Sequence, residues 1–332
     1  MGARSVLCQW SLGLGLVLLV PTADGARWSG PTVRPVWNAH GVSAFSVDGA
    51  ASAPGFLVGN TQGGLDDDWP SWAVELQHGR QAGVRIFGVC TDGSDLLSFP
   101  QVQLSNHTKQ MVARVLAAVP DALVIPRVPI GTFLGPGSPF EHAQIMAEAT
   151  SWPGHPAGSL SPISFGSLTA KWAAASAARM ATFLELLDAA FPGRIAGVHL
   201  AGLAAGEMRW EQPPEDTGLA DYSNSTVAEF CATYSTSAQC ETAPMAVERC
   251  RGVHGSNLFV SNASAEFNLF LSKQVQRAIS EIAKAAKATM DNKGLVIAFY
   301  GYLNELGGHR LSGSASHWRD CHFADALSLH RY

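Results

Sequence analysis

The clearest candidate for catalysis is one carboxylate, Glu207, which follows an apolar run over residues 195–200. A bend of small residues, 201–206, separates the two and lets the backbone turn tightly beneath a bound ligand. A glutamate held in such a bend against an apolar wall has a raised pKa and can act as a general acid. A solvent-exposed loop glutamate fits the same pattern, so the spacing leaves both interpretations open.

Other polar side chains also come directly after apolar runs: Asp92, Asp95, Arg127, Tyr300, Tyr302 and Glu305. The two tyrosines could lay their faces against a sugar ring, with Glu305 accepting hydrogen bonds from its hydroxyls. A packed aromatic pair beside a solvated glutamate explains the same residues. Arg127 could contact a ligand or anchor a buried ion pair.

Two clusters resemble ion sites, and each has a simpler explanation. The acidic turn 66–68 could bind a cation or a sugar, but carboxylates just before a helix are already favoured by its positive end. His317, Cys321 and His322 have a loose metal-ligand spacing, without the second cluster that a zinc site needs. We therefore expect no metal and no other cofactor. The motif Gly-x-Ser-x-Gly is absent, which argues against a serine hydrolase.

The elements that must position these residues alternate between short apolar runs and longer amphipathic segments. The apolar runs predict strands at 42–47, 55–59, 84–89, 122–125, 195–200 and 295–300, and residues 325–329 are expected to begin one more. Helical spacing predicts helices at 69–81, 109–119, 168–191 and 265–290. Such strands, separated by long helices, indicate a parallel sheet covered by helices, with functional loops at the carboxyl ends of the strands.

A barrel fits this pattern better than an open nucleotide-binding sheet, because no strand is followed by a glycine-rich phosphate-binding motif. We expect an α/β fold of the (β/α)8 TIM-barrel type, incomplete at its carboxyl end, with about six βα units before residue 332. One domain over 26–332 would carry long surface loops at 131–162 and 212–260, which are rich in glycine, proline and serine.

The amino terminus predicts export. Arg4 precedes the apolar run 12–20, and small residues at 23–25 suit a signal peptidase, so we expect cleavage of residues 1–25. The run is too short to span a membrane, and no later segment is long and apolar enough. The acceptor sequons for N-glycosylation begin at Asn106, Asn224 and Asn262. We expect a secreted glycoprotein without stable membrane insertion.

The net charge limits which partners are expected, and the cysteines indicate which thiols form disulfides. The net charge of −5 argues against nucleic acid, which needs a basic surface. Cys231, Cys240 and Cys250 cluster in a loop-like stretch, where one disulfide is expected. Cys90 ends an apolar strand and is expected to be a buried thiol. The sequence does not specify an oligomeric state.

Short segments spread over roughly residues 42–332 resemble glycoside hydrolases of the large (β/α)8 clan, most closely the β-galactosidase-like family 42 group. The matching segments are 82–87, 126–128, 197–207, 221–223, 299–302 and 325–332. The resemblance implies a retaining hydrolase of β-linked glycosides, with Glu207 as the acid/base at the end of the fourth strand. We also expect a set of residues to contact the sugar: Arg127, His199, Tyr300, Tyr302 and Glu305.

The chain departs from the clan at two points. Gly206 stands where most members have asparagine, so a hydrogen bond to a sugar hydroxyl is missing. The clan's nucleophile comes from the seventh strand, whereas this sequence stops in or just after the sixth. The alternatives are therefore a catalytically inactive carbohydrate-binding or structural relative, or a truncated fragment of the enzyme.

Overall fold

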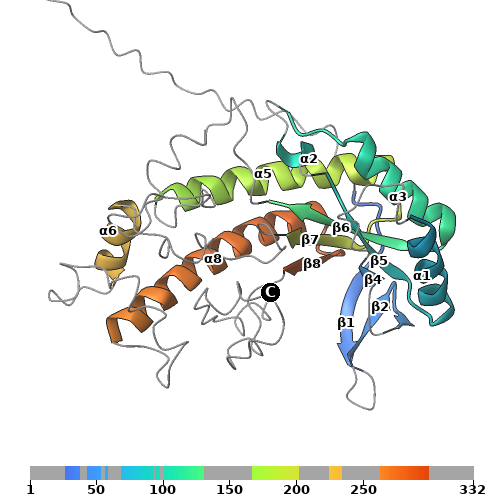
Figure 1. Cartoon of the computed structure of the whole chain (residues 1–332), viewed down its shortest axis with the longest axis horizontal. Helices are drawn as coiled ribbons and strands as arrows, with labels where there is room; N and C mark the ends of the chain where they lie inside the picture. Colours follow the sequence, from blue (N-terminus) through green and yellow to red (C-terminus); the bar gives the residue numbers. More distant parts are fainter. Residues whose placement is uncertain are drawn as a thin grey trace, which may run out of the picture.

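The computed structural model describes residues 27–37, 43–53, 57–58, 69–92, 94–97, 101–130, 167–201, 224–233 and 262–298. These residues form two sheets, one antiparallel and one parallel, with the helices gathered on one side of the parallel sheet (Figure 1). The expected loop 131–162 lies outside this part of the chain, whereas the stretch 212–260, expected to be a loop, contains a helix at Asn224–Thr233, so the loop prediction is wrong there.

A small antiparallel sheet comes first in the chain. Its strands are β1 (Val33–Trp37), β2 (Ser43–Val47) and β3 (Ala50–Ser52), in that spatial order. Asp48 and Gly49 join β2 to β3 with φ angles of 49° and 86°. A two-residue hairpin turn of matching twist needs such positive angles, which aspartate and glycine tolerate. The predicted strand at 42–47 and its turn are confirmed, and they lie in this separate sheet.

The parallel sheet contains five of the predicted strands. They are β4 (Leu57–Val58), β5 (Ile86–Cys90), β6 (Leu123–Pro129), β7 (Gly197–Ala201) and β8 (Leu295–Ala298). Every neighbouring pair is parallel, and the spatial order follows the sequence order. The predicted parallel adjacency of the last four strands is confirmed. Among the described residues β4 and β8 are the outer strands, so the sheet is seen here as an open arc.

The helices of the described chain are α1 (Trp69–Gln81), α2 (Ser94–Leu97), α3 (Asn106–Ala118), α5 (Ser167–Ala190), α6 (Asn224–Thr233) and α8 (Asn262–Thr289). The two longest, α5 and α8, pack side by side along much of their length (Figure 1). Helix α8 also contacts β8, as the sequence predicts for the helix at 265–290. Helix α6 packs onto this pair, with Phe230 edge-on to Phe270 at 5.5 Å between ring centroids.

The two faces of the parallel sheet bury different partners. Strand residues such as Phe87, Val128 and Leu200 join the main core under the helices. On the opposite face, a second cluster unites residues at the amino ends of the strands with the antiparallel sheet: Val33, Val47, Ile86, Leu123, Ile125, Ala196 and Leu295. The antiparallel sheet therefore covers the amino end of that face and leaves its carboxyl end to other residues.

A bulge at the start of β7 decides which side chains face which way. Ile195 bridges Val124, whereas His199 pairs with Arg127, so β7 contains one residue more than β6 over this stretch. The extra residue reverses the alternation of side chains, as bulges do. Gly197 lies in the bulge and packs against β8, where a Cβ atom would come within 2.1 Å of the Leu295 carbonyl oxygen.

We predict that Gly197→Ala lowers the free energy of unfolding by about 3 kcal/mol or more, because the added methyl meets backbone atoms that cannot move aside. Gly83→Ala is the matched control, since its φ is +84° but the nearest atom to the added Cβ is 4.0 Å away. That control should lose only about 1 kcal/mol from backbone strain. Urea denaturation measures both, and equal losses would contradict the close approach.

Candidate functional site

Three side chains able to do chemistry lie in adjacent strands near the carboxyl end of the parallel sheet. The register pairs Cys90 with Arg127, and Arg127 with His199. Registered neighbours present their side chains on the same face of a sheet. This is the face opposite the helices, because Val128 and Leu200, the next residues along, belong to the core under the helices. We name Cys90, Arg127 and His199 the polar row.

Burial and charge define the chemistry of the polar row. His199 is only 2% exposed, whereas Arg127 and Cys90 are half-buried. Burial, followed by the positive charge of Arg127, lowers the pKa of His199 to about 4. Its imidazole is therefore neutral near pH 7 and can donate a hydrogen bond from one nitrogen and accept one at the other. Beside it, the guanidinium offers up to five donors and no acceptor.

The backbone around the polar row is fixed by the residues after β5. The Thr91 backbone N–H and hydroxyl both donate to the Arg127 carbonyl, at 3.1 Å and 3.0 Å. These bonds continue the β5–β6 pairing past the end of β5. Arg127 therefore has a fixed backbone position at the carboxyl edge of the sheet.

Asp95, predicted near the site, has a structural role. Its Oδ1 accepts from the Ser105 backbone N–H at 2.5 Å, and its Oδ2 accepts from the Thr108 hydroxyl. The Thr108 hydroxyl in turn accepts from the Asp92 backbone N–H at 3.0 Å. Burial raises the pKa of Asp95 in spite of these bonds. Because both carboxyl oxygens hold the loop to the start of α3, Asp95 has little left to offer a ligand.

The structure describes only part of the predicted site. It brings Arg127 and His199 together, and it adds Cys90, which sequence reasoning treated only as a thiol. Four predicted site residues lie outside the described residues: Glu207, Tyr300, Tyr302 and Glu305. The acidic turn 66–68 and the cluster of His317, Cys321 and His322 also lie outside them. The apolar run 195–200 locates His199 on a strand but cannot reveal the bulge that turns it towards Arg127.

Each of the three sequons opens a helix. Asn106, Asn224 and Asn262 are the first residues of α3, α6 and α8. Asn106 is exposed, while the hydroxyl residues two positions further on, Thr108 and Thr226, are fully buried. At α3 the helix cap is Ser105, whose hydroxyl accepts from the Thr108 backbone N–H, and the Thr108 hydroxyl donates to Asp95. The threonine of this sequon therefore has a structural role beside that of directing glycan transfer.

The described residues also show the state of two cysteines and bear on metal binding and membrane crossing. Cys231, on α6, is in a disulfide whose partner lies outside the described residues, and Cys90 is a half-buried thiol. In the described ranges, no group of three or more His, Cys, Asp or Glu side chains is placed to hold a metal ion. No helix in the same ranges is both long and apolar enough to cross a membrane.

Comparison with known proteins gives distant structural likenesses. No protein-family model matches the chain, and no curated protein matches it. Among solved structures, the catalytic domain of β-amylase from Paenibacillus polymyxa aligns with a TM-score of 0.48 and 17% sequence identity. The alignment covers 73% of this chain and 65% of the β-amylase chain. A likeness this distant identifies neither a family nor an activity.

The pKa of His199 predicts a pH-dependent stability. The ordinary pKa of histidine is 6.5, and the folded protein lowers it to about 4. As the pH falls below 6.5 the unfolded chain takes up the proton first, so stability is full above pH 6.5 and is lost between 6.5 and 4. The shift corresponds to about 3 kcal/mol. We expect His199→Gln to flatten this part of the curve of unfolding free energy against pH.

Urea denaturation at a series of pH values measures that curve. His78→Gln, at an exposed position on α1, controls for the loss of an imidazole as such. Identical curves for the wild type and His199→Gln would show that His199 is not buried as a neutral imidazole.

Proposed function

We propose that the chain is a secreted, glycoside-hydrolase-like barrel protein that binds a carbohydrate at the carboxyl ends of its parallel strands. The polar row carries this proposal, because it places a guanidinium and a neutral imidazole side by side on the face opposite the helices. In a closed (β/α)8 barrel that face is the interior, and its carboxyl end is where active sites are built. The apolar cluster with the antiparallel sheet supports this polarity, since it fills the other end.

The chemistry of the polar row suits a sugar. Sugar hydroxyls both donate and accept hydrogen bonds, and neutral His199 can do the same, while Arg127 donates. Glu207 follows β7, the strand that presents His199. We assign to it the general acid that protonates the leaving glycosidic oxygen, with Tyr300 and Tyr302 against the sugar ring.

A retaining mechanism needs a second carboxylate about 5–5.5 Å from the first. Glu305, which follows β8, is the first residue to examine for that role. Binding without hydrolysis is the second candidate function. Gly206, in place of the asparagine of most clan members, favours it because one transition-state hydrogen bond is missing.

We predict that Glu207→Gln lowers kcat/KM for natural glycosides by about 10²–10⁴-fold, the usual contribution of a general acid. Glycosides with very good leaving groups should lose less, because their oxygen needs little protonation. Sugar binding, measured by calorimetry, should survive in Glu207→Gln and weaken in Arg127→Met. Glu75→Gln, at an exposed position on α1, is the matched carboxylate control.

The outcomes separate the two candidate functions. Hydrolysis that depends on Glu207 supports the enzyme, and binding without hydrolysis supports the inactive relative. A wild-type protein that neither binds nor cleaves a broad glycan panel contradicts both. Full activity in Glu207→Gln removes this residue from the mechanism.

We further propose that the protein reaches the secretory pathway through the cleaved segment 1–25. The disulfide at Cys231 supports this compartment, because disulfides persist in oxidising environments and are rare in the cytosol. The exposure of Asn106 supports a glycan there, since a glycan must project into solvent.

We predict that secreted material begins near Ala26 and that Asn106→Gln removes one glycan without a change in stability. Thr108→Ala should remove the same glycan and also destabilise the fold by about 1–3 kcal/mol, because Asp95 loses a buried donor. Thr108→Ser keeps both the sequon and the hydroxyl and serves as the control. Mass spectrometry and urea denaturation measure the effects, and a retained Met1 on cytosolic, unmodified protein would refute export.

A further inference from the structure

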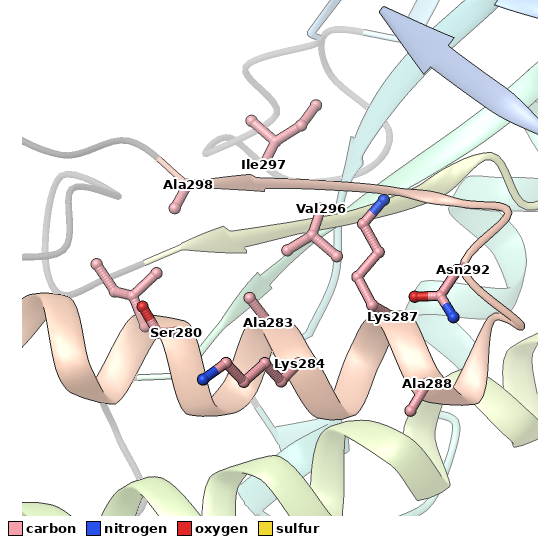
Figure 2. Close-up of a pocket in the computed structure, with 10 residues that line it drawn as sticks. Ser280, Ala283, Lys284, Lys287, Ala288, Asn292, Val296, Ile297 and Ala298 are labelled. Carbon is pink, nitrogen blue, oxygen red and sulfur yellow. The ribbon is translucent and has the colours of Figure 1, made fainter. Parts of the chain in front are cut away.

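A groove of about 620 Å³ lies between α8 and β8 (Figure 2). Its walls come from one flank of α8 and from β8, with the apolar residues Ile279, Ala283, Val296 and Ala298 beside the polar residues Lys284 and Lys287. Side chains of β8 from both faces of the sheet contribute, since Ile297 also lines the groove. The groove therefore follows the edge of β8 rather than one of its faces.

Strand β8, which borders this groove, is an edge strand of the parallel sheet in the described part of the chain. Within the described part of the chain, β8 has a strand partner on one side only, β7. Val296, Ile297 and Ala298 are half-exposed, although strands of parallel sheets are usually buried on both faces. An apolar strand edge is normally covered by another element, because its unpaired backbone groups invite association.

The lysines do not make this groove an anion site. The Lys287 ammonium donates to the Gly294 carbonyl oxygen at 2.6 Å, so it is already engaged within the turn before β8. Burial and the nearby positive charge of Arg34 lower its pKa. Figure 2 shows the Lys287 side chain rising from α8 towards the strand. Lys284 is exposed, and the groove beside it is better suited to the apolar side chains of a polypeptide segment.

We propose that this groove is the docking surface for the chain's own residues 299–332, with part of that segment pairing along the edge of β8. The segment begins directly after Ala298, which itself lines the groove. Tethering therefore gives it a far higher effective concentration than a second molecule would have.

The length of the segment and the strand predicted near its end also suit this role. A parallel crossover needs a dozen or more residues, and residues 299–324 separate β8 from residues 325–329, which are predicted to begin a strand. Docking at the edge of β8 would continue the sequence-ordered pairing of β4 to β8 by one further strand.

Cross-linking in the full-length chain tests the occupant directly. The photoreactive residue p-benzoylphenylalanine replaces Lys284 at the groove, or Lys273 as a matched exposed position on the same helix outside it. We expect illumination to join position 284 to a peptide within 299–332, in material that migrates as a monomer. A cross-link to a second copy, a peptide from elsewhere in the chain, or no yield above the Lys273 control would each overturn the proposal.

A second measurement guards against a poorly placed probe. Ala288→Arg sets a long charged side chain at the exposed rim of the groove, and Ala232→Arg makes the same change at an exposed position on α6. We expect Ala288→Arg alone to speed amide hydrogen exchange within 299–332 and β8 by at least about tenfold, which corresponds to about 1.4 kcal/mol. Equal exchange in both variants would contradict docking. Neither readout requires glycoside turnover, so their failure leaves the proposed function standing.

Discussion

The pairing of β6 with β7 is the constraint on which the candidate site depends. Residue 195 pairs with residue 124, and three positions further along β6, Arg127 meets His199 rather than Val198. One additional residue in β7 thus exchanges an apolar neighbour for an imidazole. The bulge is possible because Gly197 lets β7 approach β8 more closely than any side chain allows. A backbone detail at one glycine therefore sets the electrostatic environment of Arg127.

The parallel sheet separates its two faces by what covers them. Long helices bury one face, and a small antiparallel sheet buries only the amino end of the other. The backbone N–H of Val33 donates to the Lys293 carbonyl oxygen at 2.9 Å, which ties the antiparallel sheet to the entrance of β8. Polar groups on the second face consequently gather towards its carboxyl end. Those groups must be paired or neutral to be buried there, and His199 meets this condition by losing its charge.

The sequons coincide with helix starts, so the same residues could serve both glycosylation and folding. The segment around Asn106 is held by Ser105, whose hydroxyl accepts from the Thr108 backbone N–H at 3.1 Å, and by the Asp95 carboxylate. The residues that would direct glycan transfer are thus the same residues that begin α3. The two roles are compatible, because Asn106 faces solvent while Thr108 is buried. Export and folding place different demands on the same three-residue motif.

The sequence by itself determined β2, β4 to β8 and the long helices α1, α3, α5 and α8, since apolar runs bounded by turn residues and helical spacing are local properties. It missed β1, β3, α2 and α6. It also determined the parallel order of β5 to β8, because long amphipathic helices between apolar strands leave few other connections. It identified Arg127 from its place after an apolar run and His199 only through a resemblance, each as a separate candidate. Their proximity, the burial of Asp95 and the placing of residues 43–47 in a separate sheet depended on the tertiary structure. These features arise from contacts between distant segments, and a one-residue bulge leaves no mark on hydrophobic periodicity.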